Sequence, residues 1–268
     1  MEFGKDQITS RYFWESIKLS DSFGSNVAKL LSSKILTQSV SIITAPIIAR
    51  LFLPEHFGIR QIFMSITSVV VAISGLRYEL TIPLGKDDKE AISSFTLSSL
   101  LTTFFSLLAL ALIPFLKARI AEWFKTPELE YFLWLFPVAV FTGGVGASLK
   151  YYASRRGKFG VIAWTDFIST ASGIFTTILW GLVFGASATG LFVGYFCGTI
   201  LGVILIFGGL SREFLLDFKN SEVNFTAIWT SAKTYKKFPM FDTWSALLNS
   251  ISVQLPTFIL GLYFSPKI

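Results

Sequence analysis

The longest stretch without a charged side chain decides the fold: residues 167–211 read FISTASGIFTTILWGLVFGASATGLFVGYFCGTILGVILIFGGLS. One helix needs roughly 20 apolar residues to cross a bilayer, and this stretch has about twice that number, so it predicts two spanning helices. We expect the turn between them at Phe184–Gly190, where small residues and two glycines allow a tight connection. The chain is therefore expected to be an integral membrane protein of helical type.

Five further segments are predicted to span the membrane. Three of them are free of charge: Ala91–Leu116, Tyr131–Leu149 and Thr243–Pro266. Ile35–Ala49 and Gln61–Leu76 are shorter, but long cationic side chains at their ends can extend toward the interface, so we count both as spans. The flanking cations are Lys34, Arg50, Arg60 and Arg77. Seven transmembrane helices result.

Composition excludes other classes of protein. Hydrophobic residues make up 52% of the 268 positions and charged residues only 15%, with 28 Phe, which a water-soluble domain could not bury. A transmembrane β-barrel would show short alternations of polar and apolar residues instead of long apolar runs. Residues 1–26 are rich in charge and contain no apolar core of a signal peptide, so we expect them to remain in the cytoplasm.

The distribution of basic residues predicts the orientation. With a cytoplasmic N-terminus, about three quarters of the 23 Lys and Arg residues fall in cytoplasmic segments, as the positive-inside rule requires. The long polar segment 211–237 is then a cytoplasmic connector. This asymmetry accounts for the net charge of +6 without a nucleic acid partner, for which a basic face interleaved with stacking aromatic residues would be needed.

Signatures of enzymes and metal sites are absent from the sequence. It contains no phosphate-binding loop, no dinucleotide fingerprint and no zinc-protease motif, so we expect neither enzymatic activity nor a cofactor. The single Cys197 cannot form an internal disulfide, and the single His56 has no Cys or His partner for a metal site.

Three segments carry a resemblance to a known family. The first is residues 47–58, IIARLFLPEHFG; the second is RYEL at 77–80 followed by KDDKEA at 86–91; the third is KFP at 237–239 with WSALLN at 244–249. In this order they resemble the membrane proteins of polysaccharide biosynthesis, a family that includes O-antigen flippases. The similarity extends over nearly the whole chain from about Phe23.

This resemblance implies a fold like that of multidrug and toxin extrusion transporters, which have two lobes of six helices. The chain resembles the first lobe plus the first helix of the second. The predicted divisions are a cytoplasmic N-terminal segment at 1–26, helices one to six at 27–210, the connector at 211–237, and helix seven at 238–268. Whether one lobe is active alone stays open, because transporter sites commonly lie between two repeats.

The resemblance also implies a function: translocation of an oligosaccharide on a polyprenyl diphosphate across the bacterial inner membrane. The expected partners are this lipid-linked oligosaccharide, membrane lipids, and polymerase or assembly proteins of the polysaccharide. The alternatives are a cation-coupled drug or small-molecule antiporter of the same fold, a membrane enzyme of glycan assembly, and a remnant that only packs with partners. An antiporter would show a cavity lined by aromatic and acidic residues, and an enzyme would carry a large outer loop.

Candidate site residues follow from this substrate. Arginine suits a diphosphate because its planar fork donates in parallel and keeps its charge. The leading candidates are Arg50 and Arg77, followed by Arg60, Lys34 and Lys150; the alternative role of each arginine is that of an interfacial anchor. Candidates for ion coupling are Glu79, Asp166 and Asp242, with plain solvation as the alternative. Arg77 and Glu79 are two residues apart, so on a helix they would face different ways and would not neutralise each other.

Glycine spacing predicts a close helix contact. Gly190, Gly194, Gly198 and Gly202 recur at every fourth position and therefore lie on one face of a helix. Such a face allows another helix to approach closely, and it could also serve as a sliding surface during a conformational cycle.

Overall fold

The protein is an all-α integral membrane protein. The computed structural model describes residues 31–221 and 224–263, and within these ranges all regular structure is helical. Seven helices are long and apolar enough to cross a membrane, as the sequence predicted. They are Leu31–Leu51, Pro54–Ser74, Asp88–Trp123, Leu129–Arg155, Phe159–Val183, Ala188–Asn220 and Phe238–Tyr263. The predicted N-terminal segment 1–26 lies outside the described residues.

The bounds of the helices follow local signals in the sequence. Pro54 occupies the first turn of α2, where its missing N–H costs no hydrogen bond. Asp87 accepts from the backbone N–H of Glu90 at the start of α3, and Asn224 caps α8 in the same way. The elements after the helix Leu31–Leu51 are α2 (Pro54–Ser74), η1 (Tyr78–Leu84), α3 (Asp88–Trp123), α4 (Leu129–Phe132), η2 (Leu133–Leu135), α5 (Phe136–Arg155), α6 (Phe159–Val183), α7 (Ala188–Asn220), α8 (Phe225–Thr234), the π-helical turn η3 (Phe238–Asp242) and α9 (Thr243–Tyr263).

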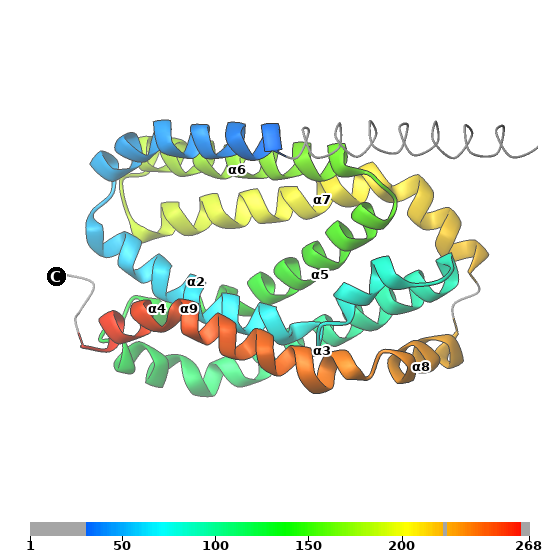
Figure 1. Cartoon of the computed structure of the whole chain (residues 1–268). Coiled ribbons are helices and arrows are strands. Elements are labelled where there is room, and N and C mark those ends of the chain that lie inside the picture. Colours follow the sequence, from blue (N-terminus) through cyan, green and yellow to red (C-terminus); the bar gives the residue numbers. More distant parts are fainter. Residues whose placement is uncertain (1–30, 222–223, 264–268) are drawn as a thin grey trace, which may run out of the picture.

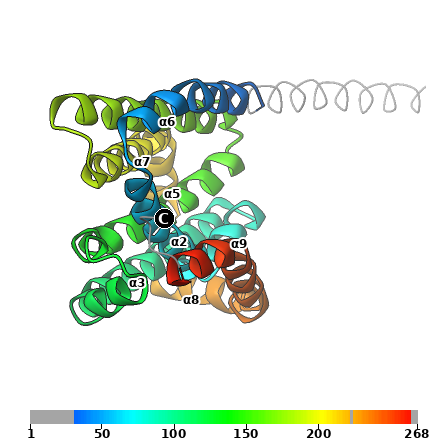
Figure 2. The ribbon, with the colours of Figure 1, turned by 90° about the vertical axis from the view of Figure 1, so that its left-hand side faces the viewer.

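The helices form two layers joined by two crossing helices. The helix Leu31–Leu51 runs beside the pair α6 and α7 in one layer, α3, α8 and α9 build the other layer, and α2 slants from the first layer to the second (Figures 1 and 2). Helix α5 is the second crossing helix, and it packs against α3, α7 and α2. We call the end of the bundle that carries α8, η1 and η3 the connector end, and the end at Arg50 and Lys117 the far end.

The predicted turn and connector differ in detail from the observed ones. Helix α6 ends at Val183 and α7 begins at Ala188, so the connection is shorter than the predicted Phe184–Gly190; Gly185 adopts a φ of +89° in it. Helix α7 continues to Asn220, well into the predicted connector 211–237. Its last turns stay helical because Phe214 is buried there against Phe95 and Tyr152.

The predicted close contact of the glycine face is confirmed. A Cβ atom added at Gly198 would lie 2.5 Å from the carbonyl oxygen of Ser169 on α6, and one at Gly194 would lie 2.6 Å from that of Gly173. The backbones of α6 and α7 therefore come into direct contact at these glycines, which is the kind of packing that stabilises helix pairs in lipid.

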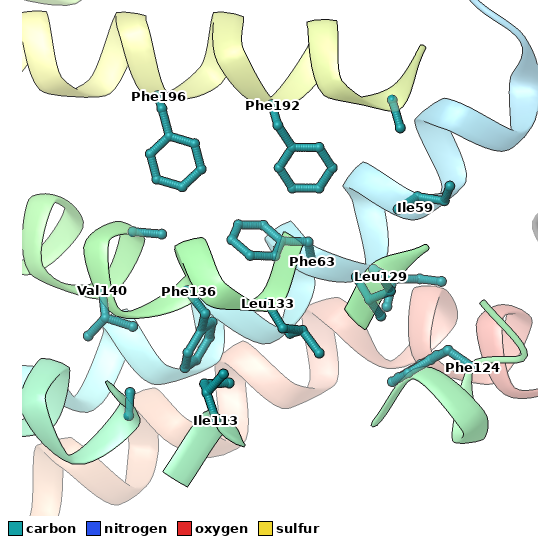
Figure 3. Packing of buried hydrophobic residues seen from close by; sticks show 14 residues of the cluster. Ile59, Phe63, Ile113, Phe124, Leu129, Leu133, Phe136, Val140, Phe192 and Phe196 are labelled. Carbon is teal, nitrogen blue, oxygen red and sulfur yellow. The ribbon is translucent and has the colours of Figure 1, made fainter. Parts of the chain in front are cut away.

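An aromatic cluster joins the two layers. Phe63 of α2 is fully buried, and its ring centroid lies 5.0 Å from that of Phe192 and 6.3 Å from those of Phe136 and Phe196, each in an edge-to-face arrangement (Figure 3). Phe192 and Phe196 point from α7 toward α2. Because three helices contribute to these contacts, the cluster fixes the position of α2, which carries the arginine described below.

The connector end holds most of the ion pairs. Arg156 pairs with Asp88 at 3.1 Å and with Asp217, linking α5, α3 and α7. Arg155 donates to the carbonyl oxygen of Gly85 at 2.7 Å, and Lys158 pairs with Glu213 at 2.7 Å. These contacts hold four helix ends together outside the apolar part of the bundle.

Candidate functional site

The principal cavity is a partly open hollow between the helix Leu31–Leu51, α2, α6 and α7. Its volume is about 540 Å³. The wall is mostly small, hydroxylated or aromatic, and its lining contains one formally charged side chain, Arg60. The polar and aromatic lining residues are Ser41, Thr44, Phe57, Arg60, Ser169, Thr170, Thr177, Tyr195 and Thr199.

Arg60 is an unpaired cation within this cavity. It lies two turns into α2, its Nε is buried without a hydrogen-bond partner, and no ion pair to it is found in residues 31–221 and 224–263. An arginine within a spanning helix is costly unless its charge is paired or hydrated. A cation without a carboxylate partner among the described residues, in the wall of a cavity, fits an anionic ligand.

Hydroxyl groups line the same cavity as this cation. Ser41 and Thr44 donate to backbone carbonyls one turn earlier in their own helix, at 3.0 and 2.6 Å. Each hydroxyl oxygen retains lone pairs and can rotate to donate elsewhere. Such a wall can hydrate or bind a polar headgroup within the membrane, and Phe57 and Tyr195 add aromatic faces of the kind that stack on sugar rings.

The structure places the other predicted cations apart from this cavity. Arg50 and Lys34 are exposed on the helix Leu31–Leu51 and line none of the described cavities. Arg77, predicted as a leading candidate, lies at the connector end with carboxylate partners. Arg60, ranked behind Arg50 and Arg77, is the predicted arginine that faces the cavity.

Arg77, Glu79 and Asp242 form one cluster. Arg77 Nε lies 2.8 Å from Asp242 Oδ2, and Arg77 Nη1 lies 3.4 Å from Glu79 Oε1. The prediction that Arg77 and Glu79 do not neutralise each other was wrong, because the segment is not α-helical there. Leu76 and Arg77 both adopt left-handed backbone conformations, with φ of +48° and +63°, which turns the chain and brings the two side chains together.

Glu79 is the buried member of this cluster. Its side chain is 10% exposed, and its Oε2 has no hydrogen-bond partner. Burial raises the pKa of the carboxyl above its ordinary 4.5; the positive charge of Arg77 opposes this rise and the negative charge of Asp242 adds to it. A carboxyl of this kind can take up and release a proton, as the ion-coupling prediction requires.

Lys150 and Asp166 form a second pair of predicted residues. Lys150 Nζ lies 2.6 Å from Asp166 Oδ1, and both side chains are partly exposed. They line a second cavity of about 250 Å³ between α5, α6 and α7. The structure thus joins a predicted phosphate-binding cation to a predicted coupling carboxylate.

Sequence reasoning missed the uncharged wall of the site. Tyr195, Ser169 and Thr199 lie in the charge-free stretch 167–211, which was interpreted only as hydrophobic spans. The signal was available, since hydroxyl residues recur along this stretch beside the glycines that bring α6 and α7 together. What the sequence could not show is which helices face them.

Fold and cavity together define a multi-pass helical membrane protein with a cavity that is lined by hydroxyl groups and one cationic side chain. The chain belongs to the family of polysaccharide biosynthesis proteins, whose family model matches residues 47–268. No curated protein and no solved structure matches the chain. Membership in this family confirms the resemblance found in the sequence, and the likeness to multidrug and toxin extrusion transporters stays a prediction.

Proposed function

We propose that the protein takes part in flipping polyprenyl-diphosphate-linked oligosaccharide across the bacterial inner membrane for surface polysaccharide synthesis. The observation that carries the proposal is Arg60, a cation without a carboxylate partner among the described residues, lining a hydroxyl-rich chamber inside a membrane bundle. Membership in a polysaccharide biosynthesis family supports it.

The chemistry of the substrate matches that of the chamber. The polyprenyl tail can stay in the lipid throughout, whereas the diphosphate and sugar must cross about 30 Å of hydrocarbon. Arg60 can donate in parallel to diphosphate oxygens and keeps its charge at any physiological pH. The hydroxyl and aromatic wall suits the sugar.

The alternative functions fit less well. An antiporter of cationic drugs would be favoured by carboxylates in the chamber, and none of the described lining residues is Asp or Glu. A glycan-assembling enzyme would need a large loop on the outer side, whereas the described helix connections at the far end are short, such as the one between Val183 and Ala188. We therefore assign no enzymatic role and no cofactor.

The proposal includes an orientation. The ion-paired, lysine-rich connector end faces the cytoplasm, where basic residues are retained, and the far end faces the periplasm. Polymerase or assembly proteins of the polysaccharide would receive the product on the periplasmic side, and no nucleic acid takes part.

The test is binding of an isoprenyl diphosphate to the purified chain in lipid nanodiscs. Farnesyl diphosphate serves as the probe, with farnesol as the ligand that lacks the diphosphate. We expect Arg60→Gln to weaken binding about tenfold or more, because a charge-assisted hydrogen bond contributes about 1.5–3 kcal/mol. Arg60→Lys should restore part of the affinity, since a lysine supplies the charge without the fork.

The matched control is Arg119→Gln, which removes an exposed arginine that lines none of the described cavities. It should bind farnesyl diphosphate like the unaltered chain. Equal binding of farnesol and farnesyl diphosphate, or equal affinity of the Arg60→Gln and Arg119→Gln variants, would reject the proposal. Restoration of surface polysaccharide in a flippase-deficient strain, lost in Arg60→Gln, would extend the result to transport.

A further inference from the structure

The two cavities meet at a pair of hydroxyl residues. The chamber that holds Arg60 and the second cavity that holds Lys150 are both lined by Ser169 of α6 and Thr199 of α7. The chamber opens among the helix Leu31–Leu51, α2, α6 and α7, whereas the second cavity lies toward α5. Ser169 and Thr199 therefore form the boundary between two hollows along the same helix pair.

The second cavity has the same kind of wall as the chamber. Its lining combines hydroxyl groups with glycines, and its large apolar side chains are few. The residues are Thr142, Gly143, Gly146, Ala147, Lys150, Thr165, Asp166, Ser169, Thr199, Gly202, Val203 and Ile206. The shared residues Ser169 and Thr199 donate to backbone carbonyls of their own helices, at 3.1 and 2.9 Å. These two hydrogen bonds therefore do not bridge the boundary.

The cations of the two cavities differ in their carboxylate partners. Arg60 has no carboxylate partner in the described part of the chain, whereas Lys150 is held by Asp166 at 2.6 Å. An ammonium has three donors, and this bond uses one of them. An arriving phosphate can therefore bind Lys150 beside Asp166 or displace it, whereas an unloaded Lys150 remains neutralised.

We propose that Lys150 is a loading site for the phosphate of the lipid-linked substrate, and that the boundary at Ser169 and Thr199 is the passage through which this headgroup reaches Arg60. The carboxylate of Asp166 stays paired with Lys150 until the phosphate takes its place. This inference rests on the proposed function and assigns the order of contacts: Lys150 first, at the half of the bundle nearer the connector end, and Arg60 second.

The single native cysteine makes the passage testable by thiol chemistry. In the full chain in nanodiscs, Cys197→Ser removes the native thiol and Ser169→Cys places a thiol at the boundary. Its reaction rate is measured with an anionic and with a cationic methanethiosulfonate reagent. Charged walls concentrate ions of opposite sign about tenfold or more, so Lys150→Gln should lower the ratio of anionic to cationic rates by that order, and Asp166→Asn should raise it. Farnesyl diphosphate should protect the thiol.

Lys117→Gln is the control, because Lys117 also pairs with a carboxylate, Glu130 at 2.7 Å, but lines neither cavity. It should leave the ratio unchanged. Equal melting temperatures show that the variants fold alike. An unreactive thiol at position 169, or a ratio that Lys150→Gln changes no more than Lys117→Gln does, would overturn the passage.

The two proposals fail in distinguishable ways. If Arg60→Gln abolishes binding of farnesyl diphosphate while Lys150→Gln leaves the thiol chemistry unaltered, the chamber stands and the passage is rejected. If Lys150→Gln and Asp166→Asn shift the ratio as expected while Arg60→Gln binds farnesyl diphosphate normally, the passage stands as an anion route and the role of Arg60 is rejected.

Discussion

The Nε of Arg77 donates to Oδ2 of Asp242 across 2.8 Å, joining the turn after α2 to the last residue of the π-helical turn before α9, 165 positions later in the chain. The same guanidinium contacts Glu79. Since α9 also packs along α2, this cluster ties the seventh span to α2 at the connector end. Movement of α9 relative to α2 must break it.

The first prediction concerns the strength of that link. Arg77→Gln and Asp242→Asn should each destabilise the chain, and the double variant should lose less than the sum of the two. Both side chains are partly exposed, at 26% and 42%, so the coupling free energy should be about 0.2–1 kcal/mol. Unfolding of the four proteins in detergent measures it. Strictly additive losses would mean that the pair contributes nothing.

The second prediction concerns pH. The pKa of Glu79 is raised above 4.5 in the folded chain, chiefly by burial. The folded state therefore binds this proton more tightly than the unfolded state does, and the resulting stability is fully present below pH 4.5 and is lost as the pH rises through the raised pKa. Glu79→Gln, which stays neutral, should flatten this part of the stability profile.

The measurement is the melting temperature from pH 4 to pH 8 in detergent. Besides Arg77 and Asp242, the hydroxyl of Ser98 lies near Glu79, since a Cβ added at Gly75 would contact both side chains. Glu128→Gln is the control, because Glu128 lies at the far end outside the cluster. If Glu79→Gln and Glu128→Gln change the profile equally, Glu79 is not its source.

The spans could be predicted from sequence because a bilayer imposes a simple rule: each crossing needs a long apolar run, and charges mark its ends. The contact between α6 and α7 could also be predicted from sequence, because Gly194 and Gly198 lie on one helix face and such a face commonly packs closely against another helix. These features depend on neighbours within one or two helical turns.

The site could be predicted only in part, because its residues depend on which helices meet. Arg50 and Arg77 are the leading candidates for substrate binding from sequence because they lie at helix ends. In the structure Arg50 is exposed and Arg77 pairs with Asp242. Arg60 has a similar position in sequence, and its place in the cavity wall follows from packing of α2 against α7. The pairing of Arg77 with Glu79 depends on two left-handed residues that no sequence periodicity reveals.

The third prediction concerns the aromatic cluster. Phe63→Ala should remove the ring that contacts Phe136, Phe192 and Phe196 and leave a cavity between α2 and α7. In water-soluble cores such a change costs about 3–5 kcal/mol. We expect the lower part of that range, since separated helices in lipid keep an apolar surrounding and lose only packing.

Phe115→Ala is the control for that change, because Phe115 is 77% exposed on α3. It should leave the free energy of unfolding nearly unchanged. Losses of similar size in the two variants would show that the cluster at Phe63 contributes no specific packing. Phe63→Leu should retain more stability than Phe63→Ala, because leucine fills part of the volume.

The fourth prediction concerns two glycines of α7 that differ only in their surroundings. A Cβ at Gly198 would lie 2.5 Å from the carbonyl oxygen of Ser169, and one at Gly208 would meet nothing within 4 Å. Gly198→Ala should therefore push α6 and α7 apart and cost about 1–3 kcal/mol, the usual range for overpacking. Gly208→Ala should leave stability unchanged or raise it by up to about 1 kcal/mol through helix propensity.

Unfolding of both variants in detergent gives the two free energies, and the sign of the difference decides the question. Opposite signs would show that the backbone contact, not glycine content, stabilises the pair. If Gly198→Ala is as stable as Gly208→Ala, then α6 and α7 do not touch at Ser169. Because Ser169 also bounds both cavities, a Gly198→Ala variant that separates the helices should widen the boundary, and a thiol placed at position 169 should then react faster with reagents of either charge.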